Sequence, residues 1–201
     1  MALVKSIFAA ALVGSLVSSA SAQTLKPDVH SLITPSVIED MRKWIETDIV
    51  RISISAQNDR LKKLPQDQID ALDTQWVEER ESDDKPLIAA TLSNPLSVYL
   101  TRLQGKSLGL YAEIFVMDQN GLNVGQSSIT GDFWQGDEAK FQKTYDVSGD
   151  ALFVDEPEWD EDNKIWRGQV SFTVTDEGNS IGAVTMEVNL TELERRTAAG
   201  A

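Results

Sequence analysis

Residues 110–127 decide the fold, and they read LYAEIFVMDQNGLNVGQS. Leu110 to Met117 is a run rich in apolar, aromatic and branched side chains, which predicts a buried strand. The polar residues 118–121, DQNG, are typical of a hairpin turn, because Asn and Gly tolerate the backbone angles that such a turn requires. Residues 122–127 then return as a second strand. The sequence therefore predicts an antiparallel hairpin here.

Helical patterns precede this hairpin. Thr34 followed by Pro35 is a helix start, with Thr34 as the N-cap and Pro35 at the first helical position. Apolar residues then recur at spacings of three and four until Pro65 ends the pattern. A charged run, residues 78–85, separates the later helical segments. The predicted helices are residues 34–64, 69–77 and 94–103.

Strand patterns dominate the part of the chain after the hairpin. Further strands are predicted over residues 151–155, 165–175 and 180–189, with turns at 156–164 and 176–179. A short helix is predicted over 138–145 and a helical tail over 191–196. Helices first and strands afterwards indicate an α+β fold, in which long N-terminal helices pack on one face of a five-stranded antiparallel sheet.

Residues 1–22 have the three parts of a cleavable export signal. Lys5 supplies a positive charge, an apolar run of eleven residues follows, and small residues precede Gln23. That run is shorter than the roughly 20 residues that span a bilayer as a helix. We therefore expect cleavage before Gln23 and a single exported domain, residues 23–201. Its expected location is the periplasm, or the medium where there is no outer membrane.

Composition excludes several classes of function. The formal net charge is −14, which repels nucleic acid and anionic lipid, so neither binding to nucleic acid nor insertion of the mature chain into a membrane is expected. The chain has no cysteine, so disulfides and thiolate metal sites are excluded. His30 is the single histidine, which argues against histidine-based triads and multi-histidine metal sites. The predicted site contains no metal and no cofactor.

The segment from residue 111 to residue 193 resembles the Cache family of extracytoplasmic sensor domains, single PAS-like modules of bacterial receptors. The stretches that carry the resemblance are AEIFVMD (112–118), LNVGQS (122–127), TGDFWQGDE (130–138), VSFTVTD (170–176) and IGA (181–183). The resemblance implies a pocket between the sheet and the loops that cover it, which binds an amino acid, an amine or a carboxylate. Receptors of this family flank the module with transmembrane helices, whereas no apolar stretch after the predicted signal is long enough for such a helix. We therefore expect this module to report to a separate membrane receptor or kinase.

The candidate ligand-binding residues are Tyr111, Asp132, Phe133, Trp134 and Asp176. Trp134 supplies an aromatic wall, and Asp132 suits a cationic group stacked on that wall. The resemblance implies that Asp176 holds the amino group of a ligand. Strand alternation places Tyr111 on the same face as Glu113, with its polar tip available to a pocket.

Each candidate also has a structural interpretation. The segment after Trp134 can serve as a helix cap, Tyr111 can be a core residue, and Asp176 can simply begin a turn. Residues 155–162 hold six carboxylates, which suit calcium chemically, but they lack the spacing of a known calcium loop and read as a solvated hairpin tip.

Two alternatives to a sensor stay open from the residues. The first is an exported hydrolase that uses carboxylates on the acidic loops, which requires two carboxylates about 5–9 Å apart across a cleft. The second is a regulatory protein without a ligand, which requires a filled pocket beside an exposed apolar patch. The sensor interpretation includes no enzymatic activity.

Overall fold

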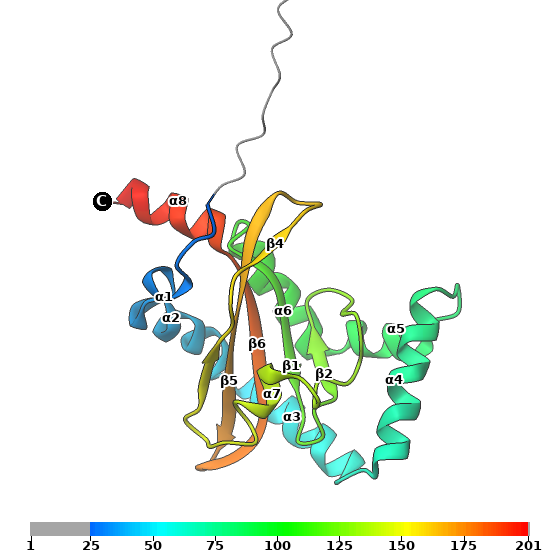
Figure 1. Cartoon of the computed structure of the whole chain (residues 1–201). Coiled ribbons are helices and arrows are strands. Elements are labelled where there is room, and N and C mark those ends of the chain that lie inside the picture. The colour runs from blue at the N-terminus through cyan, green and yellow to red at the C-terminus, as the bar shows by residue number, and fades with distance from the viewer. Residues whose placement is uncertain (1–24, 201) are drawn as a thin grey trace, which may run out of the picture.

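The computed structural model describes residues 25–200 (Figure 1). The predicted export signal lies outside these residues. The helices are α1 (Val29–Leu32), α2 (Pro35–Ile45), α3 (Asp48–Leu61), α4 (Gln66–Arg80), α5 (Pro86–Ser93), α6 (Pro95–Lys106), α7 (Ala139–Gln142) and α8 (Leu190–Gly200). The strands are β1 (Tyr111–Met117), β2 (Asn123–Gln126), β3 (Leu152–Val154), β4 (Glu158–Asp160), β5 (Ile165–Asp176) and β6 (Asn179–Asn189).

The six strands form one antiparallel sheet in the order β2-β1-β6-β5-β3, and β4 pairs with the other end of β5. The predicted hairpin is present as β1 and β2, and the predicted short helix as α7. Figure 1 shows α7 on one side of the sheet, with α3 and α6 on the other. The α+β prediction is therefore confirmed. The sixth strand, β4, lies where the sequence predicted only a turn, because Trp159 and its neighbours pair with residues 165–167.

The long helix predicted over residues 34–64 is wrong in one respect, because it breaks after Ile45. The N-cap at Thr34 is as predicted, and its hydroxyl accepts a hydrogen bond from the Val37 N–H. Ile45 and Val50 are both fully buried. In a continuous helix, two side chains five residues apart would point about 140° apart around the helix axis. The break at residues 46–47 lets both side chains face the sheet, so tertiary packing overrides the helical pattern.

Helix α5 is a second difference from the sequence prediction. Its residues follow the charged run, where no helix was predicted. The buried carboxylate of Glu79 on α4 accepts hydrogen bonds from the backbone N–H groups of Leu87 and Ile88, at 3.1 and 2.9 Å. These are donors that the first turn of a helix leaves unpaired. A cap supplied by another helix has no local sequence signal.

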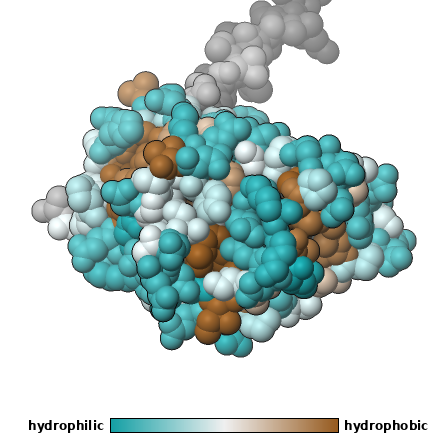
Figure 2. All heavy atoms as spheres, turned by 90° about the horizontal axis from the view of Figure 1, so that it is seen from below, coloured by the Kyte–Doolittle hydropathy of each residue, from teal (hydrophilic) through white to brown (hydrophobic). Residues whose placement is uncertain are grey.

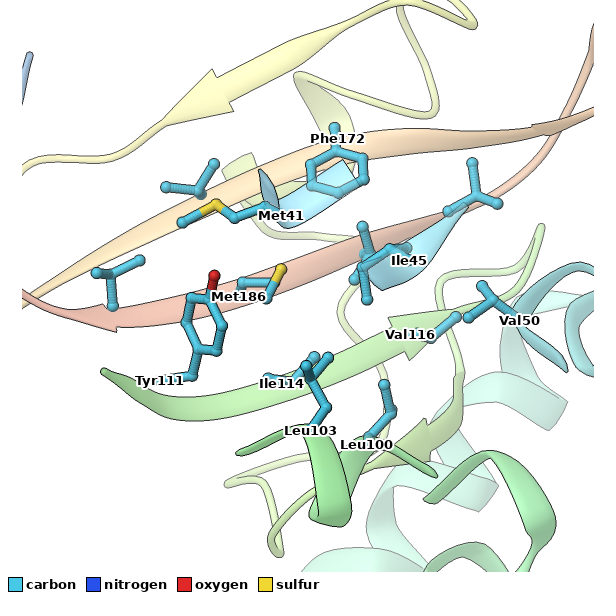
Figure 3. Close-up of a cluster of buried hydrophobic side chains, with 14 of the residues drawn as sticks. Met41, Ile45, Val50, Leu100, Leu103, Tyr111, Ile114, Val116, Phe172 and Met186 are labelled. Carbon is cyan, nitrogen blue, oxygen red and sulfur yellow. The ribbon is translucent and has the colours of Figure 1, made fainter. Parts of the chain in front are cut away.

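The main core lies between the sheet and the helices α2, α3, α6 and α8, on what we call the helix face. Figure 3 shows Met41 and Ile45 of α2 lying over Phe172 and Met186 of the sheet. Ile45 and Met186 are fully buried. Burial of this apolar surface is the main term that stabilises a chain without disulfides.

A second, smaller core lies under α4 and α5, beside the β2 edge. It is formed by Ile69, Trp76, Ile88, Leu122 and Phe133. Leu122 and Phe133 belong to the hairpin and to the loop that follows it. This core therefore fixes the loop after β2 against the α4–α5 pair.

Hydrophilic side chains cover most of the surface seen in Figure 2, and hydrophobic ones form separate small groups. Within residues 25–200, no helix has both the length and the apolar character needed to cross a bilayer.

Candidate functional site

The face of the sheet away from the long helices carries a polar floor. The register places Glu113 of β1 opposite Glu187 of β6, and Glu187 opposite Gln169 of β5. In an adjacent row, Thr185 lies opposite Ser171, and their hydroxyl oxygens are 2.9 Å apart in a hydrogen bond. Both hydroxyl residues are fully buried. Buried polar groups need such partners, and here the partners come from the neighbouring strand.

Residues 127–150, which include α7, cover part of this floor, and we call this side the loop face. Phe141 of α7 packs against Phe115 of β1 in a small apolar cluster. Lys140 Nζ lies 2.8 Å from Glu138 Oε2 and 5.4 Å from the centroid of the Phe115 ring. The Lys140 side chain is 11% exposed. Helix α7 therefore brings one largely buried ammonium group to the floor.

Arg167 of β5 connects the floor to the β4 hairpin. Its Nη1 donates to Glu187 Oε2 at 2.7 Å, and its Nη2 forms an ion pair with Asp160 of β4. The side chains of Glu187 and Asp160 are 13% and 11% exposed. Charge pairs shielded from water in this way are stronger than exposed ones. Arg167 thus holds two carboxylates on different strands.

A cavity of about 170 Å³ opens between the floor and the loops, and we call it the loop-face pocket. Its lining residues are Glu138, Asp155, Glu156, Glu158, Arg167, Gln169 and Glu187. Liquid water occupies roughly 30 Å³ per molecule, so this volume equals that of about five or six water molecules. Five of the seven lining side chains are carboxylates and one is an arginine. Three of the carboxylates, Glu138, Glu156 and Glu187, form ion pairs with Lys140, Lys26 and Arg167. Carboxylates still outnumber these cations, so the pocket favours a small cation.

Glu113 lies on the floor beside this pocket but does not line it. Burial raises the pKa of its carboxyl, and the charge of Glu187 adds to the rise. The Ser128 hydroxyl donates a hydrogen bond to Glu113, and this bond acts to lower the pKa, as do the charges of Arg167 and Lys140. The folded protein therefore holds the Glu113 proton more tightly than the unfolded chain does.

We expect Glu113→Gln to stabilise the protein at pH 7 and not near pH 4.5. A raised pKa in the folded state makes a contribution to stability that is present below the unfolded pKa, about 4.5, and is lost as pH rises through the folded pKa. Glutamine stays neutral, so its advantage should grow with pH. Urea unfolding at the two pH values measures the difference. The exposed Glu194→Gln is the control, and an equal pH-dependent gain there would contradict the prediction.

Asp132 is a sequence-predicted residue that interacts with charged groups of this site, among them Glu138 of the pocket lining. Burial raises the pKa of its carboxyl, while a hydrogen bond from Gln135 acts to lower it. The charge of Glu138 also raises this pKa, and that of Lys140 lowers it. Asp132 therefore lies among the charged groups of α7, although it does not line the loop-face pocket.

Phe133 and Trp134 hold the covering loop in place. The Phe133 ring stacks on Trp76 with 5.2 Å between centroids. The backbone N–H groups of Phe133 and Trp134 donate to the same Asp73 oxygen, at 2.7 and 2.9 Å. The Trp134 indole N–H donates to the Asn120 carbonyl at 2.9 Å, which ties the loop to the hairpin turn. Both aromatic residues thus face the second core.

Tyr111 and Asp176 lie at opposite ends of the sheet. Tyr111 pairs with Val188 near the end of β6, whereas Asp176 pairs with Asn179 at its start. Nine residues of strand separate those positions on β6, which corresponds to about 30 Å. The structure therefore does not bring the five candidate residues together in one pocket.

The sequence prediction that Tyr111 and Glu113 share a face is wrong. The pairing of β1 with β6 shifts its register between Tyr111 and Glu113, so the regular alternation of side chains is interrupted there. Tyr111 consequently joins the main core with Ile114 and Val116, while Glu113 lies on the loop face. Asp176 is 46% exposed, and its Oδ1 lies 3.8 Å from Arg51 Nε.

Sequence reasoning did not single out Lys140, Arg167 or Glu187. Period-two alternation along β5 and β6 is the signal that could have found the last two. Arg167 and Glu187 are charged residues within long, otherwise well-buried strands, and they lie on the face opposite the apolar core.

No family model matches the chain, and no curated protein matches it. Three of the solved structures that match it are sensor or ligand-binding domains. The sensory domain of the Campylobacter jejuni chemoreceptor Tlp3 has a TM-score of 0.41 and 13% identity, over 80% of this chain and 65% of that chain. The ligand-binding domain of the Pseudomonas aeruginosa PAO1 amino-acid chemoreceptor PctC, in complex with GABA, has a TM-score of 0.37 and 16% identity, over 74% and 62%.

The sensor domain of the Vibrio cholerae histidine kinase DctB has a TM-score of 0.39 and 14% identity, over 80% of this chain and 58% of that chain. The chain spans between about half and two thirds of the length of the solved structures that it matches.

Proposed function

We propose that the chain is an exported, periplasmic sensor module of Cache type, which binds a small molecule with an amino group in the loop-face pocket. The observation that carries the proposal is the excess of carboxylates in a small cavity between the sheet and the covering loops. An ammonium group is a compact cation that several carboxylate oxygens can hold through charge-assisted hydrogen bonds. An amino acid or a small amine fits both the charge and the volume.

Arg167 gives the proposed site a second specificity. Its guanidinium lines the pocket beside Glu187, so the lining offers one cationic group among its carboxylates. A ligand with both an amino group and a carboxylate would place the carboxylate toward Arg167. In this proposal the module reports occupancy to a separate membrane receptor or kinase, as the resemblance to receptor modules implies.

The hydrolase alternative is less well supported by this geometry. Its acid and base would be a carboxyl with a raised pKa and a second, ionised carboxylate, facing each other across an accessible cleft. Glu113, Asp118 and Asp132 have carboxyls with raised pKa values, but none of them lines the loop-face pocket. The carboxyls with raised pKa values and the cavity therefore do not coincide.

We expect Glu187→Gln to weaken the binding of an amine ligand by about 10- to 100-fold. The substitution preserves the shape of the side chain and removes one charge from the pocket, and a hydrogen bond to a charged group contributes about 1.5–3 kcal/mol. A thermal-shift screen of amino acids, polyamines and organic acids would select the ligand. Calorimetry on the variant then measures the loss.

Glu194→Gln, which removes an equal charge from an exposed position on α8, is the control and should bind as the unmodified protein does. A screen that selects no amine and no amino acid would contradict the proposal. Unchanged affinity in a folded Glu187→Gln protein would move the site away from the loop face.

A further inference from the structure

The helix face carries a second, larger cavity, which the proposed sensor site does not use. Its volume is about 540 Å³, within the range of small-molecule pockets. It lies where α2, the end of α6, the start of β1 and α8 meet. The lining residues are Asp40, Lys43, Trp44, Leu103, Lys106, Ser107, Leu108, Leu110, Tyr111 and Arg196. We call it the helix-face pocket.

Tyr111 places a polar group in the floor of this pocket. The residue is 7% exposed, and Figure 3 shows its ring on the helix side of β1, near Met186. Among residues 25–200 its hydroxyl has no hydrogen-bond partner, and it is not one of the unpartnered polar atoms that are sealed from solvent, so it is open to the cavity. Burial, together with the charge of Asp40, raises the pKa of Tyr111 to about 12. The hydroxyl therefore keeps its proton and can donate it in a hydrogen bond.

Three cations surround the same cavity in a chain whose net charge is −14. Lys43 forms ion pairs with Asp40 and with Glu39, both at 3.1 Å. Arg196 pairs with Glu192 at 2.8 Å. Within the described part of the chain, Lys106 has no ion-pair or hydrogen-bond partner. Asp40 is the one carboxylate in the lining, and Lys43 offsets its charge.

The walls between these polar groups are apolar and held in place. Trp44 and Leu108 are 42% and 80% exposed, so both offer unpaired apolar surface at the cavity. Leu108 has a φ of +53°, an uncommon conformation for a bulky residue. Arg196 Nη2 donates to the carbonyls of Ser107 and Leu108, at 2.8 and 3.0 Å, which fixes this turn. The turn thereby presents Leu108 at the cavity.

We propose that the helix-face pocket binds a small monocarboxylate with an apolar body. The apolar body would lie between Trp44 and Leu108, and the carboxylate would accept hydrogen bonds from the Tyr111 hydroxyl and the Lys106 ammonium. The sheet separates this pocket from the loop-face pocket. The inference therefore does not rest on the proposed function.

Calorimetry with indole-3-acetate and its neutral analogue indole-3-acetamide tests the proposal, with octanoate as a second carboxylate. We expect indole-3-acetate to bind at least about tenfold more tightly than the amide, because only the acid gains the charge-assisted bonds. Tyr111→Phe and Lys106→Gln should each weaken the carboxylates by about three- to tenfold, and should leave the amide nearly unchanged.

Arg102→Gln is the matched control, because Arg102 is an exposed cation on the same helix that does not line the pocket. Glu187→Gln, in the other pocket, should leave indole-3-acetate binding unchanged. The proposal is overturned if neither carboxylate binds at a concentration of about 5 mM, because a specific site should have a Kd below that concentration. Equal binding of acid and amide, or an equal loss in Arg102→Gln, also overturns it.

Discussion

Asp118→Ala is expected to lower the free energy of unfolding by about 3–5 kcal/mol, because it leaves several buried donors without an acceptor. Asp118 is fully buried in the turn between β1 and β2. Its Oδ1 accepts from the backbone N–H groups of Asn120 and Leu122, at 2.7 and 3.0 Å, and its Oδ2 accepts from Gln57 Nε2 at 3.1 Å. Urea unfolding measures the loss.

The control for this change is Asp118→Asn. An asparagine keeps one oxygen for the two backbone donors and removes the charge, whose burial raises the pKa of Asp118. We expect it to cost less than half as much as alanine. Equal losses for the two variants would mean that the charge, rather than the hydrogen bonds of the turn, is what stabilises this region.

Trp76→Ala is expected to cost about 3–5 kcal/mol, as usual for a large aromatic residue removed from a core. Trp76 is fully buried, its ring stacks on Phe133, and its indole N–H donates to the Thr130 carbonyl at 3.0 Å. The loss should be local as well as global. Hydrogen exchange should accelerate in residues 127–136, while β5 and β6 keep most of their protection.

Trp44→Ala makes the same chemical change at a residue that is 42% exposed, and it should cost far less. Similar losses for the two tryptophans would contradict the assignment of Trp76 as the centre of the second core. Loss of protection throughout the sheet would show that the two cores unfold as one unit.

The parts of the fold predicted correctly from sequence are those with local signals. The DQNG turn after an apolar run predicted the hairpin, the Thr34 cap predicted the start of α2, and the helix predicted over residues 94–103 is α6. The Asn94 side chain accepts from the Ser97 N–H at 2.8 Å, as a cap does. Helix α5 and the break after Ile45 could not be predicted, because both depend on contacts with elements distant in sequence.

The candidate site was less predictable for the same reason. Glu113, Arg167 and Glu187 are far apart in the chain, and only the strand register brings them together. The irregularity next to Glu113 reversed the expected side of Tyr111 and thereby moved it into a different cavity. The segment around Trp134, which resembles a ligand-binding motif, instead packs its aromatic side chains into the second core.

The strand order of the sheet also constrains the sequence of events by which the chain acquires its structure. The central strand, β6, is the last of the six to be synthesised, and it lies between β1 and β5. Until residues 179–189 have emerged, the nascent chain can form the β1–β2 hairpin and local helices, but β1 and β5 have no common neighbour. Contacts between β1 and β6 span about 70 residues, and pairing at such separations is slow. The complete sheet therefore cannot form before β6 has been synthesised, and a truncation before β6 should yield no cooperative unfolding transition.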